Sequence, residues 1–191
     1  MRTIPNLILA SSSPRRRELL LRIGIENFSV IPARDELKPN QGDPEKYVLL
    51  LSAQKAGDVA QRAHEDDIIL AADTIVWLEG KILEKPVDRE DAERMLGELS
   101  GRKHTVYTGV TLRRGSRIES FCEAAGVFFR ELGEDEIAQY VASGEPMDKA
   151  GAYGVQGIGA RFVTRIDGDY SCVVGLPLSR VYLALKDFGL F

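Results

Sequence analysis

Two short apolar segments constrain the fold of this 191-residue chain more than any other feature. Residues 7–10 (Leu-Ile-Leu-Ala) and 68–72 (Ile-Ile-Leu-Ala-Ala) contain no polar side chain. An apolar run of this length is typical of a strand that is buried on both faces, and such strands occur mainly in parallel sheets covered by helices. We therefore expect a strand at each segment, inside a sheet that has helices on its faces.

Helix signals alternate with these strand signals. Ser13 as N-cap, Pro14 at the first helical position and Gly24 at the end predict a helix over residues 15–23. Further helices are predicted at 44–62, 88–99, 135–141 and 177–186, and further strands at 28–31, 75–78, 81–83, 105–112, 118–129, 161–166 and 170–174. The pattern predicts one α/β domain over residues 1–191, with a mixed central sheet flanked by helices.

The charge balance limits the partners of the chain. It has 25 Lys and Arg against 29 Asp and Glu, which gives a formal net charge of −4. A hydrophobic content of 44% with 28% charged residues is ordinary for a globular protein and excludes wholesale disorder. The acidic balance argues against nucleic acid and against a membrane surface as partners. A polyanionic ligand is therefore expected to bind in a local basic pocket.

Cysteine and histidine usage indicates a cytoplasmic protein without a zinc site. Cys122 and Cys172 each lie in an apolar stretch and are expected to be free thiols. The two histidines, His64 and His104, lie in unrelated segments, and there is no C-x-x-C motif. The sequence has neither a secretory signal nor an apolar run of membrane-spanning length, so we expect a soluble, cytoplasmic chain.

Three arginines occupy the first turn of the helix predicted after Ser13. Arg15, Arg16 and Arg17 lie where the positive end of the helix dipole favours carboxylates. A bound anion reverses this preference, because backbone amides, guanidinium groups and the hydroxyls of Ser11 and Ser13 then converge on it. We expect a phosphate site here; the alternative is that the arginines extend into water.

Asp73 and Thr74 directly follow the apolar segment 68–72, and the strand is expected to end there. Ligands of α/β proteins gather beyond the carboxyl ends of strands, so this carboxylate is expected to face a ligand. A carboxylate opposite an anion site indicates a divalent cation or a water nucleophile between the two. The alternative is an aspartate that only begins a turn.

A glycine-rich stretch at 145–159 has few large apolar residues and predicts a long loop. Its glycines allow close backbone approach, Tyr153 offers a stacking face, and Gln156 offers both a hydrogen-bond acceptor and a donor. These features suit recognition of a nucleobase edge. The alternative is a structural loop that binds no ligand.

The absence of several motifs narrows the chemistry. The chain has no G-x-x-x-x-G-K-[ST] and no G-x-S-x-G, and Phe162 stands where the third glycine of a dinucleotide fingerprint would fall. Phosphate chemistry by a carboxylate and a metal ion is the best-supported option that remains.

The other charged candidates are Glu36, Lys55 and Lys85, each of which also fits an ordinary surface charge. Pro86 restricts the backbone of Lys85.

Segments spread over nearly the whole chain follow the motif order of one known family. They are 11–16 (SSSPRR), 72–74 (ADT), 85–86 (KP), 100–104 (SGRKH), 144–157 (GEPMDKAGAYGVQG), 167–170 (DGDY) and 174–178 (VGLPL). In these segments the chain resembles the Maf family of nucleoside triphosphate pyrophosphatases, and the long glycine-rich segment is the most specific of them. The resemblance implies an elongated α/β fold similar to that of inosine triphosphatases, with two lobes around a deep cleft, and a homodimer.

The resemblance also implies a reaction and its residues. The chain looks like the branch that hydrolyses dTTP and UTP to the nucleoside monophosphate and pyrophosphate with Mg²⁺, for which Mn²⁺ or Co²⁺ are alternatives. Asp73 falls on the family's catalytic acidic position and would bind the cation together with Glu36. The positions that set substrate preference fall on Arg15, Thr74 and Gln156. The residues expected to hold the triphosphate are Ser11, Ser13, Arg15, Arg16, Lys55 and Lys85.

Two alternatives stay open at this point. The chain could prefer 7-methyl-GTP or a modified pyrimidine nucleotide, which would keep the reaction and change the base. The family's name refers to septum formation in cell division, which allows a nucleotide-binding regulator without catalytic activity. Against this regulator stands Asp73, which would repel an anionic ligand unless a metal ion lay between them.

Overall fold

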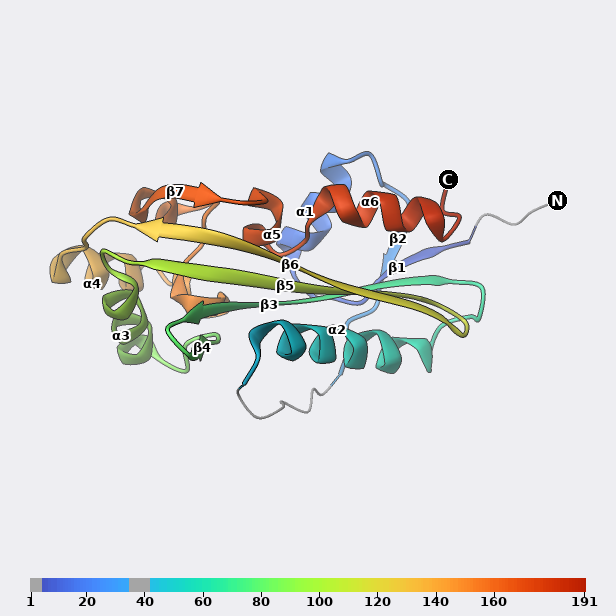
Figure 1. Cartoon of the computed structure of the whole chain (residues 1–191), viewed down its shortest axis with the longest axis horizontal. Coiled ribbons are helices and arrows are strands. Elements are labelled where there is room, and N and C mark those ends of the chain that lie inside the picture. The colour runs from blue at the N-terminus through green and yellow to red at the C-terminus, as the bar shows by residue number, and fades with distance from the viewer. Residues whose placement is uncertain (1–4, 35–41) are drawn as a thin grey trace. The chain divides into compact units, whose positions relative to one another are not determined.

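The computed structural model describes residues 5–34 and 42–191. Within these ranges seven strands form one sheet in the order β2-β1-β3-β5-β6-β7, with β4 paired to β3 (Figure 1). The strands are β1 (Leu7–Leu9), β2 (Phe28–Val30), β3 (Ile68–Leu78), β4 (Lys81–Leu83), β5 (Lys103–Arg114), β6 (Arg117–Phe129) and β7 (Val163–Asp167). The α-helices are α1 (Pro14–Arg22), α2 (Pro44–Ala60), α3 (Arg89–Leu99), α4 (Glu134–Ala142), α5 (Tyr170–Val174) and α6 (Leu178–Asp187). The short 3₁₀ helices are η1 (Glu145–Asp148), η2 (Ala150–Ala152) and η3 (Ile158–Phe162).

The sheet is mixed. β1 pairs in parallel with β2 and β3, whereas β4 pairs antiparallel with β3 and β7 pairs antiparallel with β6. The predicted α/β class with a mixed central sheet and flanking helices is therefore confirmed. The chain divides into two compact units, the first made of residues 1–73, 108–123 and 175–191, and the second of residues 74–107 and 124–174. The predicted cleft between two lobes stays a prediction.

In the first unit, helices cover both faces of the strands: α2 lies on one side, and α1 and α6 lie on the other (Figure 1). Ile8, Ile69 and Ala71 pack against Ala56 and Val59 of α2. All three residues of β1 are buried. The apolar segments therefore form strands that are buried on both faces, as their composition predicts.

Helix α2 approaches β5 very closely at Gly109. A Cβ atom at this position would lie 2.5 Å from the carbonyl carbon and oxygen of Val48. Next to this contact, the Ser52 hydroxyl is hydrogen bonded to Thr111 Oγ1 at 2.9 Å, and Thr111 is hydrogen bonded to Ser120 Oγ of β6 at 2.9 Å. Ser52 and Thr111 are buried. The missing side chain at Gly109 thus allows buried hydroxyl groups to fix α2 on the sheet.

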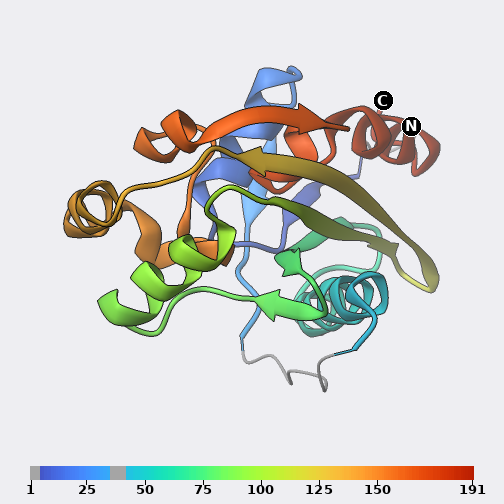
Figure 2. The same ribbon diagram turned by 60° about the vertical axis from the view of Figure 1, so that its left-hand side comes forward.

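The second unit is built around a cluster of aromatic side chains. Phe162 of η3 lies edge-on to Tyr140 of α4, with ring centroids 4.9 Å apart, and 5.9 Å from Phe129 of β6. Edge-to-face contacts of this kind are the arrangement that aromatic rings favour. Figure 2 shows β7 alongside β6, with which it pairs. The cluster therefore fastens both α4 and η3 to the sheet.

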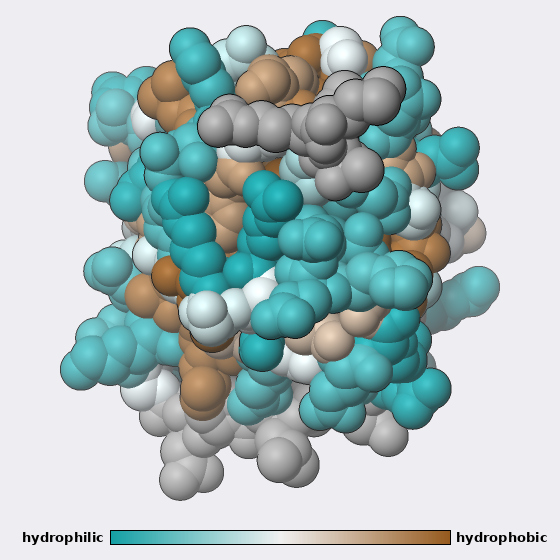
Figure 3. Space-filling model, turned by 90° about the vertical axis from the view of Figure 1, so that its right-hand side faces the viewer, coloured by the Kyte–Doolittle hydropathy of each residue, from teal (hydrophilic) through white to brown (hydrophobic). Residues whose placement is uncertain are grey.

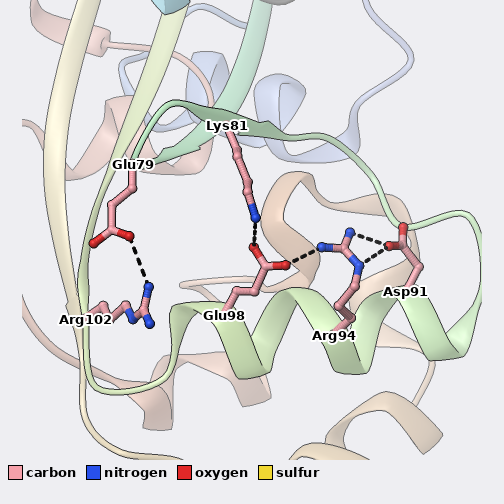
Figure 4. Close-up of polar contacts among 6 residues, drawn as sticks. All are labelled: Glu79, Lys81, Asp91, Arg94, Glu98 and Arg102. Atoms are coloured by element: carbon pink, nitrogen blue, oxygen red, sulfur yellow. Dashed lines mark hydrogen bonds and ion pairs between the residues drawn. The ribbon is translucent and has the colours of Figure 1, made fainter.

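Exposed ion pairs connect α3 with β4 (Figure 4). The helix begins after Asp88, whose carboxylate accepts a hydrogen bond from the Asp91 amide at 2.8 Å, as an N-cap residue does. Arg94 donates to Asp91 Oδ1 and to Glu98 Oε1, both at 2.6 Å, and Lys81 donates to Glu98 Oε2 at 3.4 Å. The hydrogen bonds from Arg94 hold the pKa of Asp91 below its usual value. Ion pairs this exposed stabilise only weakly, and the pair from Lys81 is the one that joins α3 to β4.

Two predicted elements are wrong. The strand predicted over residues 68–72 does not end at Asp73 but joins the strand predicted at 75–78 to form β3, which lies between β1 and β5 in the sheet. Residues 170–174 form the helix α5 where a strand was expected. The carboxylate of Asp169 accepts a hydrogen bond from the Ser171 amide at 2.7 Å, which turns the chain into a helical start.

The described part of the chain confirms the predicted state of the two cysteines. Cys122 and Cys172 are free thiols, as predicted. The face shown in Figure 3 is largely hydrophilic, with hydrophobic residues in smaller, separate areas. Among the described residues, no helix combines the length and the apolar character needed to cross a membrane.

Gly109→Ala is expected to lower the free energy of unfolding by about 1–3 kcal/mol, because the added methyl group forces α2 away from β5. The matched control is Gly57→Ala in α2, where a Cβ atom meets nothing within 4 Å. There the reduced backbone entropy of the unfolded chain favours a gain of about 0.5–1 kcal/mol. Urea unfolding followed by circular dichroism measures both. Equal unfolding free energies for Gly109→Ala and the parent chain would contradict the close contact.

Candidate functional site

Asp73 and Lys55 form an ion pair in the first unit. The Nζ atom of Lys55 lies 2.5 Å from Asp73 Oδ1 and 3.5 Å from the carbonyl oxygen of Ala72. The side chain of Lys55 is 11% exposed and that of Asp73 is 13% exposed. Asp73 lies on the same face of β3 as Ala71, which packs against α2, and Lys55 comes from that helix. The structure therefore brings together two of the residues that the sequence singled out.

The pairing of β1 with β3 places the start of α1 near this ion pair. Leu9 lies opposite Leu70, and the Ala10 amide donates to the Leu70 carbonyl oxygen at 2.8 Å. Ser11 follows Leu9 by two positions, and Asp73 follows Leu70 by three. Because the two strands are parallel, the loop that leads into α1 leaves the sheet on the same side as Asp73.

Ser11, Ser13 and Arg16 form a hydrogen-bonded group at this loop. Ser11 Oγ accepts from the Ser13 amide at 3.2 Å and from Arg16 Nη1 at 3.1 Å. Arg16 is buried, and its Nε donates to the Gly175 carbonyl oxygen at 2.8 Å. These bonds hold the loop against the segment that precedes α6. Arg16 therefore has a structural role in addition to its predicted one in phosphate binding, which stays a prediction.

The first turn of α1 differs from those of the helices capped by aspartate. Ser13 occupies the N-cap position, as predicted, but its side chain makes no capping hydrogen bond, and the first turn contains no acidic residue. In α2, by contrast, the carboxylate of Asp43 accepts hydrogen bonds from two amides. Arg15 lies in the α1 turn and is half-buried. A turn with amide groups, basic side chains and no carboxylate is suited to an anion.

Lys85 lies on a segment of the second unit whose backbone is fixed on both sides. The Glu84 carbonyl oxygen accepts a hydrogen bond from the Gly151 amide at 3.0 Å, and the Val87 amide donates to Asp91 Oδ2 at 3.1 Å. The side chain of Lys85 itself is exposed. The rigidity predicted for this position from the following proline agrees with these contacts.

The two predicted specificity residues outside α1, Thr74 and Gln156, belong to the second unit and are half-buried. Thr74 follows Asp73 within β3, so the alternation along the strand directs their side chains to opposite faces. Gln156 lies between η2 and η3.

Tyr153 does not offer the stacking face expected of it. The side chain is only 6% exposed, and its hydroxyl lies 2.8 Å from His104 Nε2. The rings of both residues contact Phe129 edge-on, at centroid distances of 4.8 and 4.9 Å. Burial lowers the pKa of His104 to about 4, so the imidazole is neutral near pH 7. The expected base-stacking residue is therefore part of the core.

The glycine-rich stretch is not the long irregular loop expected, since η1, η2 and η3 lie within or adjoin it. Gly151 has a φ of +67°, and a Cβ atom there would lie 2.7 Å from Val76 Cγ2. Close packing thus explains this glycine. Glu145 and Tyr140 were not predicted to have a role, although the carboxylate of Glu145 accepts hydrogen bonds from the end of this stretch. The glycines that surround Glu145 were the available signal.

The described residues offer one predicted metal ligand. Mg²⁺ is commonly held by one or two carboxylates, with water and substrate phosphates completing its shell. Asp73 is a donor of this kind, whereas Glu36, the second predicted ligand, lies outside the described residues. Residues 5–34 and 42–191 contain no group of three or more His, Cys, Asp or Glu side chains that could hold a metal ion. This donor set fits a cation bound through one carboxylate and the substrate.

Comparison with known families assigns the chain to one of them. Residues 6–188 match the family model described as Maf-like protein. The match covers nearly the whole chain and contains the Lys55–Asp73 pair, the α1 turn and the glycine-rich stretch. This chain belongs to the Maf family, as its motifs predict.

Several curated relatives share one name, dTTP/UTP pyrophosphatase. The dTTP/UTP pyrophosphatase of Bacillus velezensis is 49% identical over 185 residues, which are 96% of this chain and 97% of the relative. That of Vibrio vulnificus is 47% identical over 182 residues, covering 95% and 98%. That of Carboxydothermus hydrogenoformans is 49% identical over 185 residues, covering 96% and 98%.

Among solved structures, that of the Staphylococcus aureus Ham1 protein matches 95% of this chain and 98% of its own. The sequence identity is 14% and the TM-score is 0.49.

The chain is expected to lose stability between pH 6.5 and pH 4 because of His104. Its folded pKa of about 4 lies below the unfolded value of about 6.5. The folded state therefore excludes a proton that the unfolded state binds. As the pH falls, the free energy of unfolding decreases by an amount that grows to about 3 kcal/mol. His104→Gln, less stable at neutral pH, is expected to show a flatter acid dependence of the unfolding free energy in urea.

The matched control is His64→Gln, because His64 is exposed. This variant is expected to keep the parent's acid dependence. An unchanged dependence in His104→Gln would contradict the assignment.

Proposed function

We propose that this chain hydrolyses dTTP and UTP to the nucleoside monophosphate and pyrophosphate. The observation that carries the reaction type is the largely buried Lys55–Asp73 pair near the start of α1. The choice of substrate is supported by the names of relatives that are 47–49% identical over almost their whole length.

Asp73 is the residue we assign to water activation. Its carboxylate would orient a water molecule and accept its proton as the water oxygen attacks the α-phosphorus. The new bond joins this oxygen to phosphorus, and the α–β anhydride bond breaks with its electrons on pyrophosphate. A positioned general base of this kind contributes about 10²–10⁴-fold to the rate.

Cationic side chains would bind the negative charge of the triphosphate and of the departing pyrophosphate. Lys55, Arg15 and Lys85 are the residues we assign to this task, and Ser11, Ser13 and Arg16 shape the loop around it. Stabilisation of charge that develops in the transition state is commonly the largest contribution to catalysis of this type. Holding the substrate in line adds a further contribution.

A divalent cation, Mg²⁺ in our proposal, would be held by Asp73 and by substrate phosphates, with Glu36 as a second ligand. Bound there, it would neutralise phosphate charge and polarise the α-phosphoryl group. Mn²⁺ and Co²⁺ have similar ligand preferences and are alternatives.

Gln156 is the residue we assign to the pyrimidine base, with Thr74 in support. A carboxamide can donate to O4 of uracil or thymine and accept from N3–H.

We also propose that the chain is cytoplasmic, in keeping with its free thiols, and that it acts as a homodimer, as the family resemblance implies. A role in septum formation, and the regulator without catalytic activity, have no observation in their favour.

Asp73→Asn is expected to lower kcat for dTTP and UTP by about 10²–10⁴-fold, because the amide cannot accept the water proton. Pyrophosphate release with and without Mg²⁺ measures the effect, and circular dichroism checks that the variant is folded. Asp66→Asn, at a side chain that is 89% exposed, is the matched control and is expected to have normal activity.

The same assay tests the proposal as a whole with dTTP, UTP, CTP, GTP, ITP and 7-methyl-GTP. Release led by 7-methyl-GTP would keep the enzyme and overturn the assigned base. Absence of release from every triphosphate by folded protein would favour the regulator.

A further inference from the structure

The segment 154–159, which carries Gln156, is anchored at both ends by side chains of the second unit. Tyr153, just before the segment, is buried against His104. The far end is bound by Glu145, the first residue of η1. Gln156 therefore occupies a short span between two fixed points, which matters for a residue assigned to the base.

The Glu145 carboxylate accepts three hydrogen bonds. Its Oε2 accepts from the Ile158 amide at 2.8 Å, and its Oε1 accepts from the Gly159 amide at 3.1 Å and from the Tyr140 hydroxyl at 2.9 Å. The buried Tyr140 oxygen in turn accepts from the Gly154 amide at 3.1 Å. One carboxylate and one phenol thus hold both the beginning and the end of the segment.

Three glycines allow the backbone to wrap around these side chains. A Cβ atom at Gly157 would lie 2.6 Å from Cδ of Glu145, and one at Gly159 would lie 2.7 Å from the Tyr140 hydroxyl oxygen. At Gly154 it would lie 2.7 Å from Lys149 Cε. Because the backbone contacts these groups directly, we expect a substitution at Glu145 to change the position of the backbone at Gln156.

The charge of Glu145 is maintained by its surroundings. Burial raises the pKa of this carboxyl, but hydrogen bonds from the Ile158 and Gly159 amides and from Tyr140, with the positive charge of Lys149, outweigh burial and bring the pKa below its usual value. An ionised carboxylate accepts hydrogen bonds at both oxygens, whereas a carboxamide accepts at only one. Glutamine at this position would direct an NH₂ group at a donor.

We propose that Glu145 is the positioning residue for base recognition: its carboxylate holds the segment 154–159 so that Gln156 meets the pyrimidine edge. The inference rests on the proposed function, because it assumes that Gln156 contacts the base. Glu145 acts through Gln156, and its loss is expected to change which nucleotide is hydrolysed more than how fast the phosphate chemistry proceeds.

Glu145→Gln is the test, because it keeps the size of the side chain and removes one acceptor. The ratio of kcat/KM for UTP over that for CTP is expected to fall by about tenfold to a hundredfold, mainly through KM, as for a recognition group displaced by about 1 Å. Glu93→Gln, at an exposed position of α3 in the same unit, is the matched control and is expected to keep the ratio.

A double-mutant cycle separates positioning from a general structural effect. The variant Glu145→Gln/Gln156→Ala is expected to have the same ratio as Gln156→Ala alone, since Glu145 acts only through Gln156. Independent, multiplicative losses would overturn the proposal, as would an unchanged ratio in Glu145→Gln.

Hydrogen exchange of the Ile158 and Gly159 amides gives a readout besides activity. Their exchange is expected to become about tenfold faster or more in Glu145→Gln, because the carboxylate no longer protects them, and to stay unchanged in Glu93→Gln. Unchanged exchange in Glu145→Gln would overturn the anchoring. If the parent chain fails to prefer UTP over CTP, the proposed function fails, and the exchange data alone decide whether Glu145 holds the segment.

Discussion

A largely buried carboxylate needs a compensating charge near it, and the placement of α2 supplies that charge to Asp73. Lys55 reaches Asp73 because α2 is pressed onto the sheet, with the backbone of Val48 against Gly109. Taking an unpaired charge out of water is costly, so neither member of the pair is well placed without the other. The position of α2, and with it the placement of Lys55 beside Asp73, depends on the close approach of Val48 to Gly109.

In the second unit, the main constraint is that a glycine-rich segment is held in one conformation. Glycines leave the backbone free, and that freedom must be removed by contacts from outside the segment. The Glu145 carboxylate and the Tyr140 phenol provide those contacts by accepting backbone amide hydrogen bonds. The same glycines that allow flexibility in the unfolded chain are required here because no side chain would fit.

Much of the fold follows from local patterns. The apolar runs at 7–10 and 68–72 became buried strands, and Ser13-Pro14, Asp43-Pro44 and Asp88 mark the starts of helices. One of the errors has a long-range cause. β3 lies between β1 and β5 in the sheet, and pairing with strands so distant in the sequence is a property that a local polar residue does not reveal.

For the candidate site too, some features could be predicted from the sequence and others only from the structure. Residue types and their order along the chain were enough to select Asp73, Arg15, Lys55 and Gln156, because phosphate chemistry needs particular side chains and the family motifs keep their order. Other contacts of the structure could not be foreseen. Burial of Tyr153 against His104 and the hydrogen bond from Arg16 to Gly175 join residues far apart in the chain. The three hydrogen bonds to Glu145 come from residues that lie 5, 13 and 14 positions away, but they depend on how the glycine-rich segment folds. The sequence therefore specified the chemical groups, whereas three-dimensional packing decided which of them contact a neighbour and which lie in the core, since those contacts exist only once separate segments meet.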